Sequence, residues 1–185
     1  MSNISLRFRI VDDIENISKL NRDGLDLEGD PEGFFEIQGE RFSYGYFHEN
    51  EIEMGEEGEY LIAVWFELFL KAAIALNSHD YVAIKDVDSI NRWVQIEKVQ
   101  QDNVSLKIIS TDMPKESVIT TQRFDDRKER PSELIVAISC FRKEVIFSAR
   151  LYLEQLVAIN RHFMATRRYL YLKGLVEETE TLGVG

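Results

Sequence analysis

The segment LIAVWFELFLKAAIAL, residues 61–76, constrains the fold of this chain more than any other feature. Only Glu67 and Lys71 are charged among its 16 residues. It is shorter than the about 20 apolar residues that cross a bilayer, and its charges lie in its middle. A helix that is apolar on nearly every side has to be buried. We therefore expect a core helix over 58–76. The aromatic residues expected in the core are Phe34, Trp65, Phe66, Phe69 and Trp93.

Short runs of alternating or apolar residues predict strands on both sides of this helix. They are ISLRFRIVD, FFEIQ, RFSYGYF, YVAIKDV, RWVQIEKV, VSLKIIST and ELIVAIS, with a short strand within SVITTQ. A tight turn at Gly39-Glu40 joins the second run to the third. Hairpins dominate this order, and no strand–helix–strand series recurs. The sequence therefore predicts an α+β fold, an antiparallel, meander-type sheet with two or three helices packed mainly on one side.

The hairpin of RWVQIEKV and VSLKIIST has two competing registers. A three-residue loop at 101–103 places Glu97 opposite Lys107, with Asn103 in the left-handed conformation. A two-residue loop would place Lys98 opposite Lys107, which like charges disfavour. We therefore expect the three-residue loop.

The last third of the chain predicts two more helices. Ser139 is the expected N-cap of the first, whose apolar residues recur every three or four positions. These residues are Phe141, Val145, Ala149, Tyr152, Leu156 and Ile159. The other helix is expected over 162–176. The length of 185 residues suits a single globular domain over 1–185. Its loops include 21–33, and its tail 177–185 is expected to fray.

Acidic residues are concentrated in the first third of the chain. Residues 1–60 contain 16 Asp/Glu and 5 Lys/Arg, whereas 61–185 contain 17 of each, so the net charge of −11 arises in 1–60. Such a surface repels nucleic acid and anionic membranes and attracts basic proteins. The alternative is that the acids only keep the protein soluble. The basic stretch 167–173 is expected to pair with the acidic region, within one molecule or between two.

Several kinds of chemistry lack their usual residues. KLNRDGLDLEGD places Lys19 at the first ligand position of a calcium loop, where a positive charge opposes the cation. His48, His79 and His162 are scattered, and HExxH, CxxC, GxSxG and a glycine-rich phosphate loop are all missing. Cys140 allows no internal disulfide and is expected to be an ordinary buried cysteine. We expect a cytoplasmic, unsecreted protein with no metal or other cofactor.

The stretch HENEIEMGEEGEY, residues 48–60, holds six glutamates. If the preceding strand continues to residue 54, three of them share one face and have no nearby basic residue in the sequence. We expect these three, Glu49, Glu51 and Glu53, to contact a basic protein partner; the alternative is that they protect a sheet edge from aggregation. The other three, Glu56, Glu57 and Glu59, are expected at the N-terminus of the following helix, where negative charge is favourable.

Four stretches carry a resemblance in layout over about residues 33–160. They are FFEIQGERFSYGYF, VWFELFL, RWVQIEKVQQDNVSLKII and ISCFRKEVIFSARLYLEQLVAIN. Together they resemble small acidic bacterial immunity proteins, which neutralise the toxic domains of polymorphic or contact-dependent toxins. The resemblance implies a non-enzymatic binding protein, often an acidic inhibitor of a basic toxin nuclease domain, and it transfers no functional residue.

Three hypotheses follow from these observations. The first is an immunity protein that occludes a toxin domain with its acidic surface. The second is a small enzyme or ligand-binding protein, which a deep cleft with buried carboxylates of perturbed pKa would favour. The third is a homo-oligomeric structural domain. A flat or convex acidic surface would favour the first.

Overall fold

The computed structural model describes residues 3–53, 56–100, 102–111, 118–124 and 132–182. Its strands are β1 (Ser5–Ile10), β2 (Gly33–Gly39), β3 (Phe42–Tyr46), β4 (Tyr81–Lys85), β5 (Arg92–Val99), β6 (Asn103–Ser110), β7 (Ile119–Thr120) and β8 (Glu133–Ala137). Its helices are α1 (Ile14–Ile17), α2 (Arg22–Glu28), α3 (Ile62–Ala75), α4 (Ile138–Ile159), the 3-10 helix η1 (Arg161–Ala165) and α5 (Arg167–Thr181).

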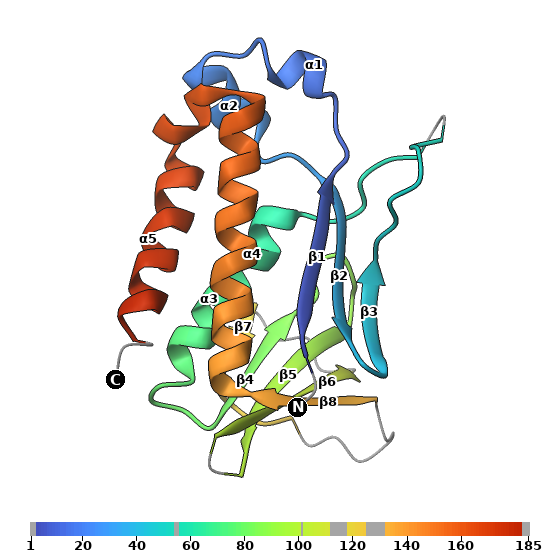
Figure 1. Cartoon of the computed structure of the whole chain (residues 1–185), viewed down its shortest axis with the longest axis vertical. Coiled ribbons are helices and arrows are strands. Elements are labelled where there is room, and N and C mark those ends of the chain that lie inside the picture. The colour runs from blue at the N-terminus through green and yellow to red at the C-terminus, as the bar shows by residue number, and fades with distance from the viewer. Residues whose placement is uncertain (1–2, 54–55, 101, 112–117, 125–131, 183–185) are drawn as a thin grey trace.

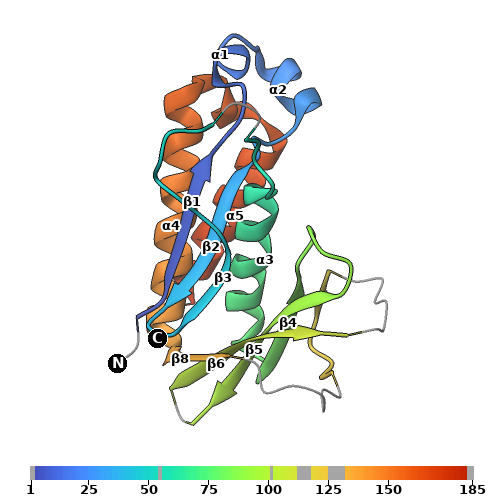
Figure 2. The same ribbon diagram turned by 90° about the vertical axis from the view of Figure 1, so that its right-hand side faces the viewer.

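The strands form two antiparallel sheets, in the orders β1-β2-β3 and β7-β4-β5-β6-β8. Figure 1 shows the five-stranded sheet at the lower ends of α3 and α4. Figure 2 shows the three long helices, α3, α4 and α5, on one side of the three-stranded sheet. The predicted α+β class is confirmed. Helix α3 lies between β3 and β4 in the sequence, and the strands before and after it form separate sheets. Helices α1 and α2 are additional to the two or three helices that the sequence predicted.

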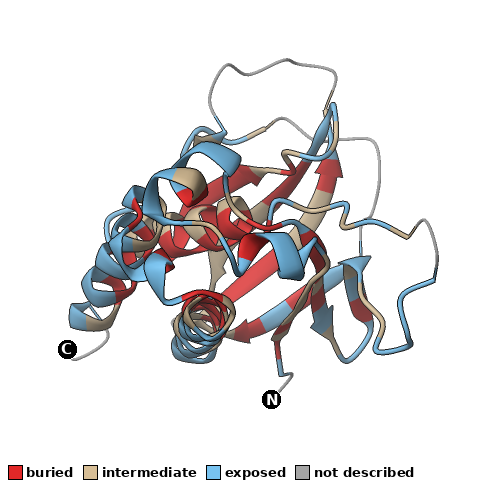
Figure 3. Cartoon of the chain, turned by 90° about the horizontal axis from the view of Figure 1, so that it is seen from above, coloured by how far each residue is buried: buried red, intermediate tan, exposed pale blue. Residues whose placement is uncertain are grey.

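Helix α3 is the centre of the core, as its composition predicts. It packs against α4, α5, β2 and β4. Trp65 is 1% exposed, and its ring stacks on those of Phe35 and Phe69. Phe34, Phe66 and Trp93 are buried as well. Figure 3 shows buried residues gathered where the helices and sheets face one another.

The start of α3 differs from the prediction by four residues. The helix begins at Ile62, with Leu61 as its N-cap. Tyr60 is held in an extended conformation by two backbone hydrogen bonds with Gly33, at 3.1 and 2.9 Å. The prediction for Glu56, Glu57 and Glu59 is therefore wrong, because the first turn of α3 contains no acidic residue.

The hairpin of β5 and β6 has a three-residue connection, but its register differs from the prediction. Val99 pairs with Asn103, so Lys107 lies opposite Gln95 instead of Glu97. The left-handed residue is Gln100, with φ of 53°. The sequence predicted that Glu97 and Lys107 would pair with each other, but each forms an ion pair with a residue outside the hairpin. Glu97 pairs with Arg123 at 2.5 Å and Lys107 with Glu133 at 3.1 Å.

Two short helices occupy the region between β1 and β2. The prediction of a loop over 21–33 is wrong for α2. The Asn21 side chain accepts a hydrogen bond from the Gly24 N–H at 2.9 Å and so caps this helix. Leu25 is buried and anchors the helix to the core.

The two C-terminal helices have other limits than predicted. The helix expected over 162–176 is divided into the 3-10 helix η1 and α5, which begins at Arg167 because Thr166 caps it. Helix α4 begins at Ile138 with Ala137 as N-cap, so Ser139 is not the cap. Five of the six predicted stripe residues are fully buried: Phe141, Val145, Ala149, Tyr152 and Leu156. Cys140 is exposed, which contradicts the prediction of a buried cysteine.

The tail expected to fray from residue 177 is helical as far as Thr181 in α5. Thr179 is buried, and its hydroxyl donates to the Leu175 carbonyl at 2.7 Å. Glu180 pairs with Arg150 of α4 at 2.5 Å. These contacts hold the last turns of the helix, and residues 183–185 lie outside the described part of the chain.

Candidate functional site: an acidic pocket

A concave, acidic site lies at the C-terminal end of β1, where three separate stretches of the chain meet. The cavity has a volume of about 620 Å³. We call its lining residues the acidic pocket: Arg9, Ile10, Val11, Asp12, Asp13, Ile14, Glu32, Ile52, Glu56, Glu57 and Gly58. They come from β1 and α1, from the residue before β2, and from the connection between β3 and α3. Figure 2 shows this connection passing across β1 and β2.

Backbone contacts hold these stretches together. The Val11 N–H donates to the Glu32 carbonyl at 2.9 Å, and the Glu32 N–H donates to the Asp12 carboxylate at 3.2 Å. Gly58 lies directly against β2, since a Cβ atom at this position would be 2.4 Å from the Gly33 nitrogen. A residue with a side chain at position 58 would push the connection off the sheet.

Five carboxylates line the pocket, and their hydrogen-bond partners are neutral backbone groups or a histidine. Asp12 and Asp13 accept bonds from backbone N–H groups. Glu56 contacts His48 Nε2 at 2.6 Å and accepts the Glu53 N–H at 3.1 Å. Within the described part of the chain, none of the five forms an ion pair with lysine or arginine. The other two are Glu32 and Glu57, which are exposed.

Arg9 is the one cation in the pocket lining, and its guanidinium group donates hydrogen bonds to backbone carbonyls. Its Nη1 donates to the carbonyl oxygens of Asn50 at 2.6 Å and His48 at 3.3 Å. The hydrogen bond from the Glu53 backbone, followed by the contacts with His48, lowers the pKa of the Glu56 carboxyl. Glu56 is therefore ionised at neutral pH, and the pocket holds more negative than positive charge.

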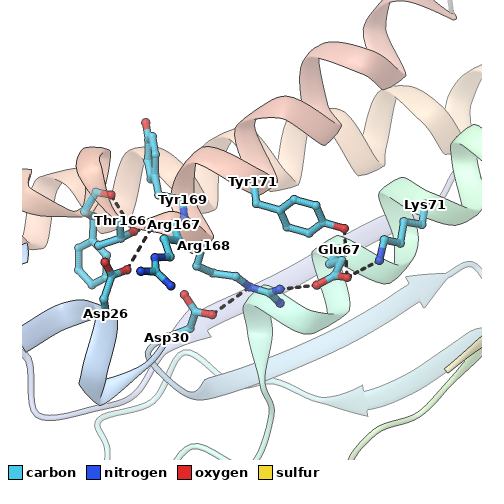
Figure 4. A network of polar contacts seen from close by, with 10 residues as sticks. Asp26, Asp30, Glu67, Lys71, Thr166, Arg167, Arg168, Tyr169 and Tyr171 are labelled. Atoms are coloured by element: carbon cyan, nitrogen blue, oxygen red, sulfur yellow. Dashed lines mark hydrogen bonds and ion pairs between the residues drawn. The ribbon is translucent and has the colours of Figure 1, made fainter. Parts of the chain in front are cut away.

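Some acidic residues elsewhere in the first third of the chain form ion pairs. Arg7 lies 3.3 Å from Glu36, and Arg22 lies 3.6 Å from Asp26. Arg168 of α5 lies between Asp30, at 3.0 Å, and Glu67 (Figure 4). This last pair confirms that the basic stretch 167–173 meets the acidic region within one molecule. The acidic pocket differs in that five carboxylates share one lining with a single arginine, so its net charge is negative.

The network around Arg168 also contains carboxyl groups with perturbed pKa values. Burial raises the pKa of Asp30 despite the nearby guanidinium. Burial would also raise the pKa of Glu67, but Lys71 and Arg168 outweigh it and lower the value. Neither carboxylate lines the acidic pocket. Figure 4 shows that the network joins α5 to α3 and to the residues after α2, which indicates a structural role.

A second acidic pair lies in the turn between β4 and β5. Asp86 is 5% exposed and accepts a hydrogen bond from the Tyr44 hydroxyl. Asp88 accepts one from Trp65 Nε1 at 3.1 Å. Burial is the largest cause that raises the pKa of Asp88. The hydrogen bond from Trp65 acts in the opposite direction, and the negative charge of Asp86 adds to the increase. These contacts tie the turn to β3 and α3, so the pair is explained by packing between the two sheets.

The three glutamates predicted to bind a partner do not share a strand face. Strand β3 ends at Tyr46, and residues 47–53 are irregular. Glu49 lies 3.7 Å from Arg7, so it has a basic neighbour that the local sequence does not reveal. Glu51 and Glu53 are exposed on either side of Ile52, which lines the acidic pocket. Edge-strand protection requires a strand at this place and is therefore not supported.

Two features of the structure and three comparisons with known proteins complete the description of the site. In the described residues, no group of three or more His, Cys, Asp or Glu side chains is arranged to hold a metal ion. Among the helices described, none combines the length and apolar character needed to cross a membrane. No protein-family model, curated protein or solved structure matches the chain.

Sequence reasoning missed all five acids of the pocket, because it assigned Glu56 and Glu57 to a helix N-terminus and did not single out the other three. These three are Asp12, Asp13 and Glu32. Their signal is the position of VDD directly after a strand and of DPEG directly before one. Ends of paired antiparallel strands lie side by side, so acids flanking them meet once β1 and β2 are paired. The sequence predicted both strands but not that these ends would face the 48–60 stretch.

Proposed function

We propose that this chain is a non-enzymatic protein-binding protein whose acidic pocket receives basic side chains of a partner. The observation that carries the proposal is the set of five carboxylates around one cavity, with their single arginine already bonded to carbonyl oxygens. A lysine or arginine entering the pocket would supply the missing charge and could donate hydrogen bonds to several carboxylates at once.

The concave shape bears on the choice among the three hypotheses. A flat or convex acidic surface would have favoured occlusion of a toxin, whereas the acidic surface here is hollow. The carboxylates of the hollow lie at the surface, unlike the buried acid–base pair that a hydrolytic enzyme requires. Recognition of protruding basic side chains therefore fits the pocket better than catalysis. Immunity to a basic toxin domain is the specific form of this function that the sequence layout suggests.

Electrostatic complementarity would act mainly on the rate of association. Uncompensated negative charge steers a basic partner toward the pocket, and salt screens this attraction. Glu51 and Glu53, on the rim beside Ile52, extend the same field, and Glu49 adds to it although Arg7 partly compensates its charge. We retain these three glutamates as partner-binding residues in the proposal.

Affinity capture with charge variants tests this function. The immobilised chain is exposed to lysate of its native host at low and high salt, and captured proteins are identified by mass spectrometry. The Glu32→Gln/Glu57→Gln variant should lose a basic protein that the wild type retains at low salt. The matched control, Glu154→Gln/Glu178→Gln, makes the same change in net charge at exposed sites on α4 and α5.

The control should capture the partner as the wild type does. Equal loss in both variants would show that only the overall charge matters, and equal retention in both would reject the pocket as the binding site. Glu49→Gln/Glu51→Gln/Glu53→Gln should slow association and make it less sensitive to salt.

A further inference from the structure

Strand β1 is an edge of the three-stranded sheet, and only part of that edge is covered. The backbone N–H and C=O groups of Leu6 point away from β2. Its N–H donates to Glu144 at 2.8 Å, and its carbonyl accepts from Ser148 at 3.3 Å. Both partners belong to α4. This helix therefore occupies the first half of the edge, and Figure 1 shows α4 running beside β1.

The second half of the edge is open. In an antiparallel ladder alternate residues face the partner strand, and β1 pairs with β2 in a continuous register from Ser5↔Gln38 to Ile10↔Gly33. Phe8 and Ile10 therefore point their N–H and C=O groups in the same direction as Leu6. In the described part of the chain, no side chain bonds these outward groups. An open edge of this kind can accept another strand.

A mainly apolar groove lies along this open half. Its volume is about 530 Å³, and its lining comes from β1, α1 and the C-terminal half of α4: Phe8, Arg9, Ile10, Ile14, Gln155, Ala158 and Ile159. The groove thus offers unpaired backbone groups on one side and apolar side chains on the other. Peptides that add a strand to a sheet use both, since the backbone gives affinity and alternate side chains enter pockets.

The groove and the acidic pocket are continuous. Arg9, Ile10 and Ile14 line both cavities. A chain pairing with Phe8 and Ile10 would therefore bring its neighbouring residues to the five carboxylates. At about 3.3 Å per residue, a strand of five or six residues covers about 17–20 Å and so continues past Phe8 and Ile10.

We infer that the groove between β1 and α4 binds an extended segment of a partner protein, which adds a fourth strand to the edge of β1. The segment carries apolar residues facing the groove and at least one lysine or arginine for the acidic pocket. This inference rests on the proposed function and specifies the form of the partner. The charge of the adjoining pocket selects a basic segment over an acidic one.

The probe is a display library of random peptides about twelve residues long, twice the length of a typical strand. The library is panned on the intact chain, and the tightest peptide is synthesised. Enriched sequences should alternate apolar residues and contain lysine or arginine. Binding should slow amide exchange of Phe8 and Ile10 at least about tenfold, because these N–H groups become bonded. The Leu6 amide, already bonded to Glu144, serves as the internal control.

Two substitutions at one exposed position test the groove. Ala158→Trp fills the groove without changing charge and should weaken the peptide at least about tenfold, whereas Ala158→Ser leaves the groove open and should not. Absence of any binder, or peptides that lack basic residues, bind as helices or leave Phe8 and Ile10 exchange unchanged, would overturn the inference.

The variants also separate this inference from the proposed function. Loss of the basic host protein in Glu32→Gln/Glu57→Gln but not in Ala158→Trp would leave the acidic pocket as the site and reject strand addition. Retention of that protein in both variants would reject the two proposals together. Loss in both, with Ala158→Ser behaving as wild type, supports both.

Discussion

At the scale of single residues, Arg168 joins three parts of the molecule through two carboxylates. Its Nε lies 3.0 Å from Asp30, and its Nη1 donates to Glu67. The Nε–Asp30 contact is an ion pair whose angle does not suit a hydrogen bond. Among the described residues, the buried Nε and Nη2 atoms therefore have no hydrogen-bond partner. The hydroxyl of Tyr152 is buried and unbonded in the same way, and burial raises its pKa well above the usual value.

Replacing Arg168 should therefore destabilise the fold. Arg168→Met leaves Asp30 and Glu67 partly buried without their shared cation, and we expect a loss of about 3 kcal/mol in the free energy of unfolding. Urea denaturation followed by circular dichroism measures the change. Arg167→Met is the matched control, because the neighbouring side chain is exposed and its removal should change stability by less than about 0.5 kcal/mol. Equal stability of the two variants would show that the Arg168 network contributes little.

The pH dependence of stability reports on Glu67. Its pKa is lowered from 4.5, because the contributions of Lys71 and Arg168 exceed the effect of burial. A carboxyl with a lowered folded-state pKa stabilises the fold above its unfolded value and loses this contribution as the pH falls through the folded-state value. The stability difference between wild type and Glu67→Gln should be full above pH 4.5 and shrink below it. A difference that stays constant across acid denaturation curves would contradict this assignment.

At the scale of elements, α3 supports both sheets through its aromatic residues. Trp65 is 1% exposed, stacks on Phe35 and donates to Asp88. Trp65→Ala should cost about 3–5 kcal/mol, the usual range for deletion of a buried aromatic side chain. Ile90→Ala, at a side chain that is 95% exposed, should leave the melting temperature nearly unchanged. An unchanged melting temperature for Trp65→Ala would show that α3 is not a core helix.

The turn between β5 and β6 allows a test of backbone strain. Gln100 has φ of 53°, a conformation that costs a residue with a Cβ about 1 kcal/mol. Gln100→Gly should therefore stabilise the protein by about 0.5–1 kcal/mol in thermal or urea denaturation. Asn103→Gly should not, because Asn103 lies within β6 and pairs with Val99 and Ala137. Stabilisation by Asn103→Gly instead would favour the register expected from the sequence.

The elements that the sequence predicted are those set by local composition and spacing. The apolar composition of α3 and the stripe of α4 were sufficient to identify both helices. The hairpin register was not predictable, because Arg123 and Glu133, which neutralise Glu97 and Lys107, belong to distant segments. The start of α3 depends in the same way on Gly33, which holds Tyr60 extended.

At the scale of the whole molecule, the charge distribution was predictable and its geometry was not. The excess of acids in residues 1–60 follows directly from the sequence. Which acids find a cation depends on the tertiary structure: Asp30 meets Arg168 of α5, whereas Glu32 nearby meets none among the described residues. The candidate site therefore emerged only when the ends of β1 and β2 were placed against the 48–60 stretch.

A single core connects the two sheets. One cluster of buried side chains contains Leu6 and Phe35 of the first sheet and Val94 and Leu106 of the second, joined through α3. Because both sheets pack against α3 in this one cluster, we expect the chain to unfold in one cooperative transition. The smaller cluster around Trp93, on the other face of the five-stranded sheet, should unfold with it.

The two tryptophans test this expectation because they lie in different clusters. Trp93→Phe leaves only Trp65, which stacks on Phe35 of the first sheet. Trp65→Phe leaves only Trp93, whose ring centroid lies 4.9 Å from that of Phe124. In each variant, the urea transition measured by tryptophan fluorescence should coincide with that measured by far-ultraviolet circular dichroism. The comparison within each variant cancels any stability lost through the substitution. A Trp93 transition at lower urea than the circular dichroism transition would show that the second face of the five-stranded sheet unfolds on its own, and the shared core would then not extend its cooperativity across that sheet.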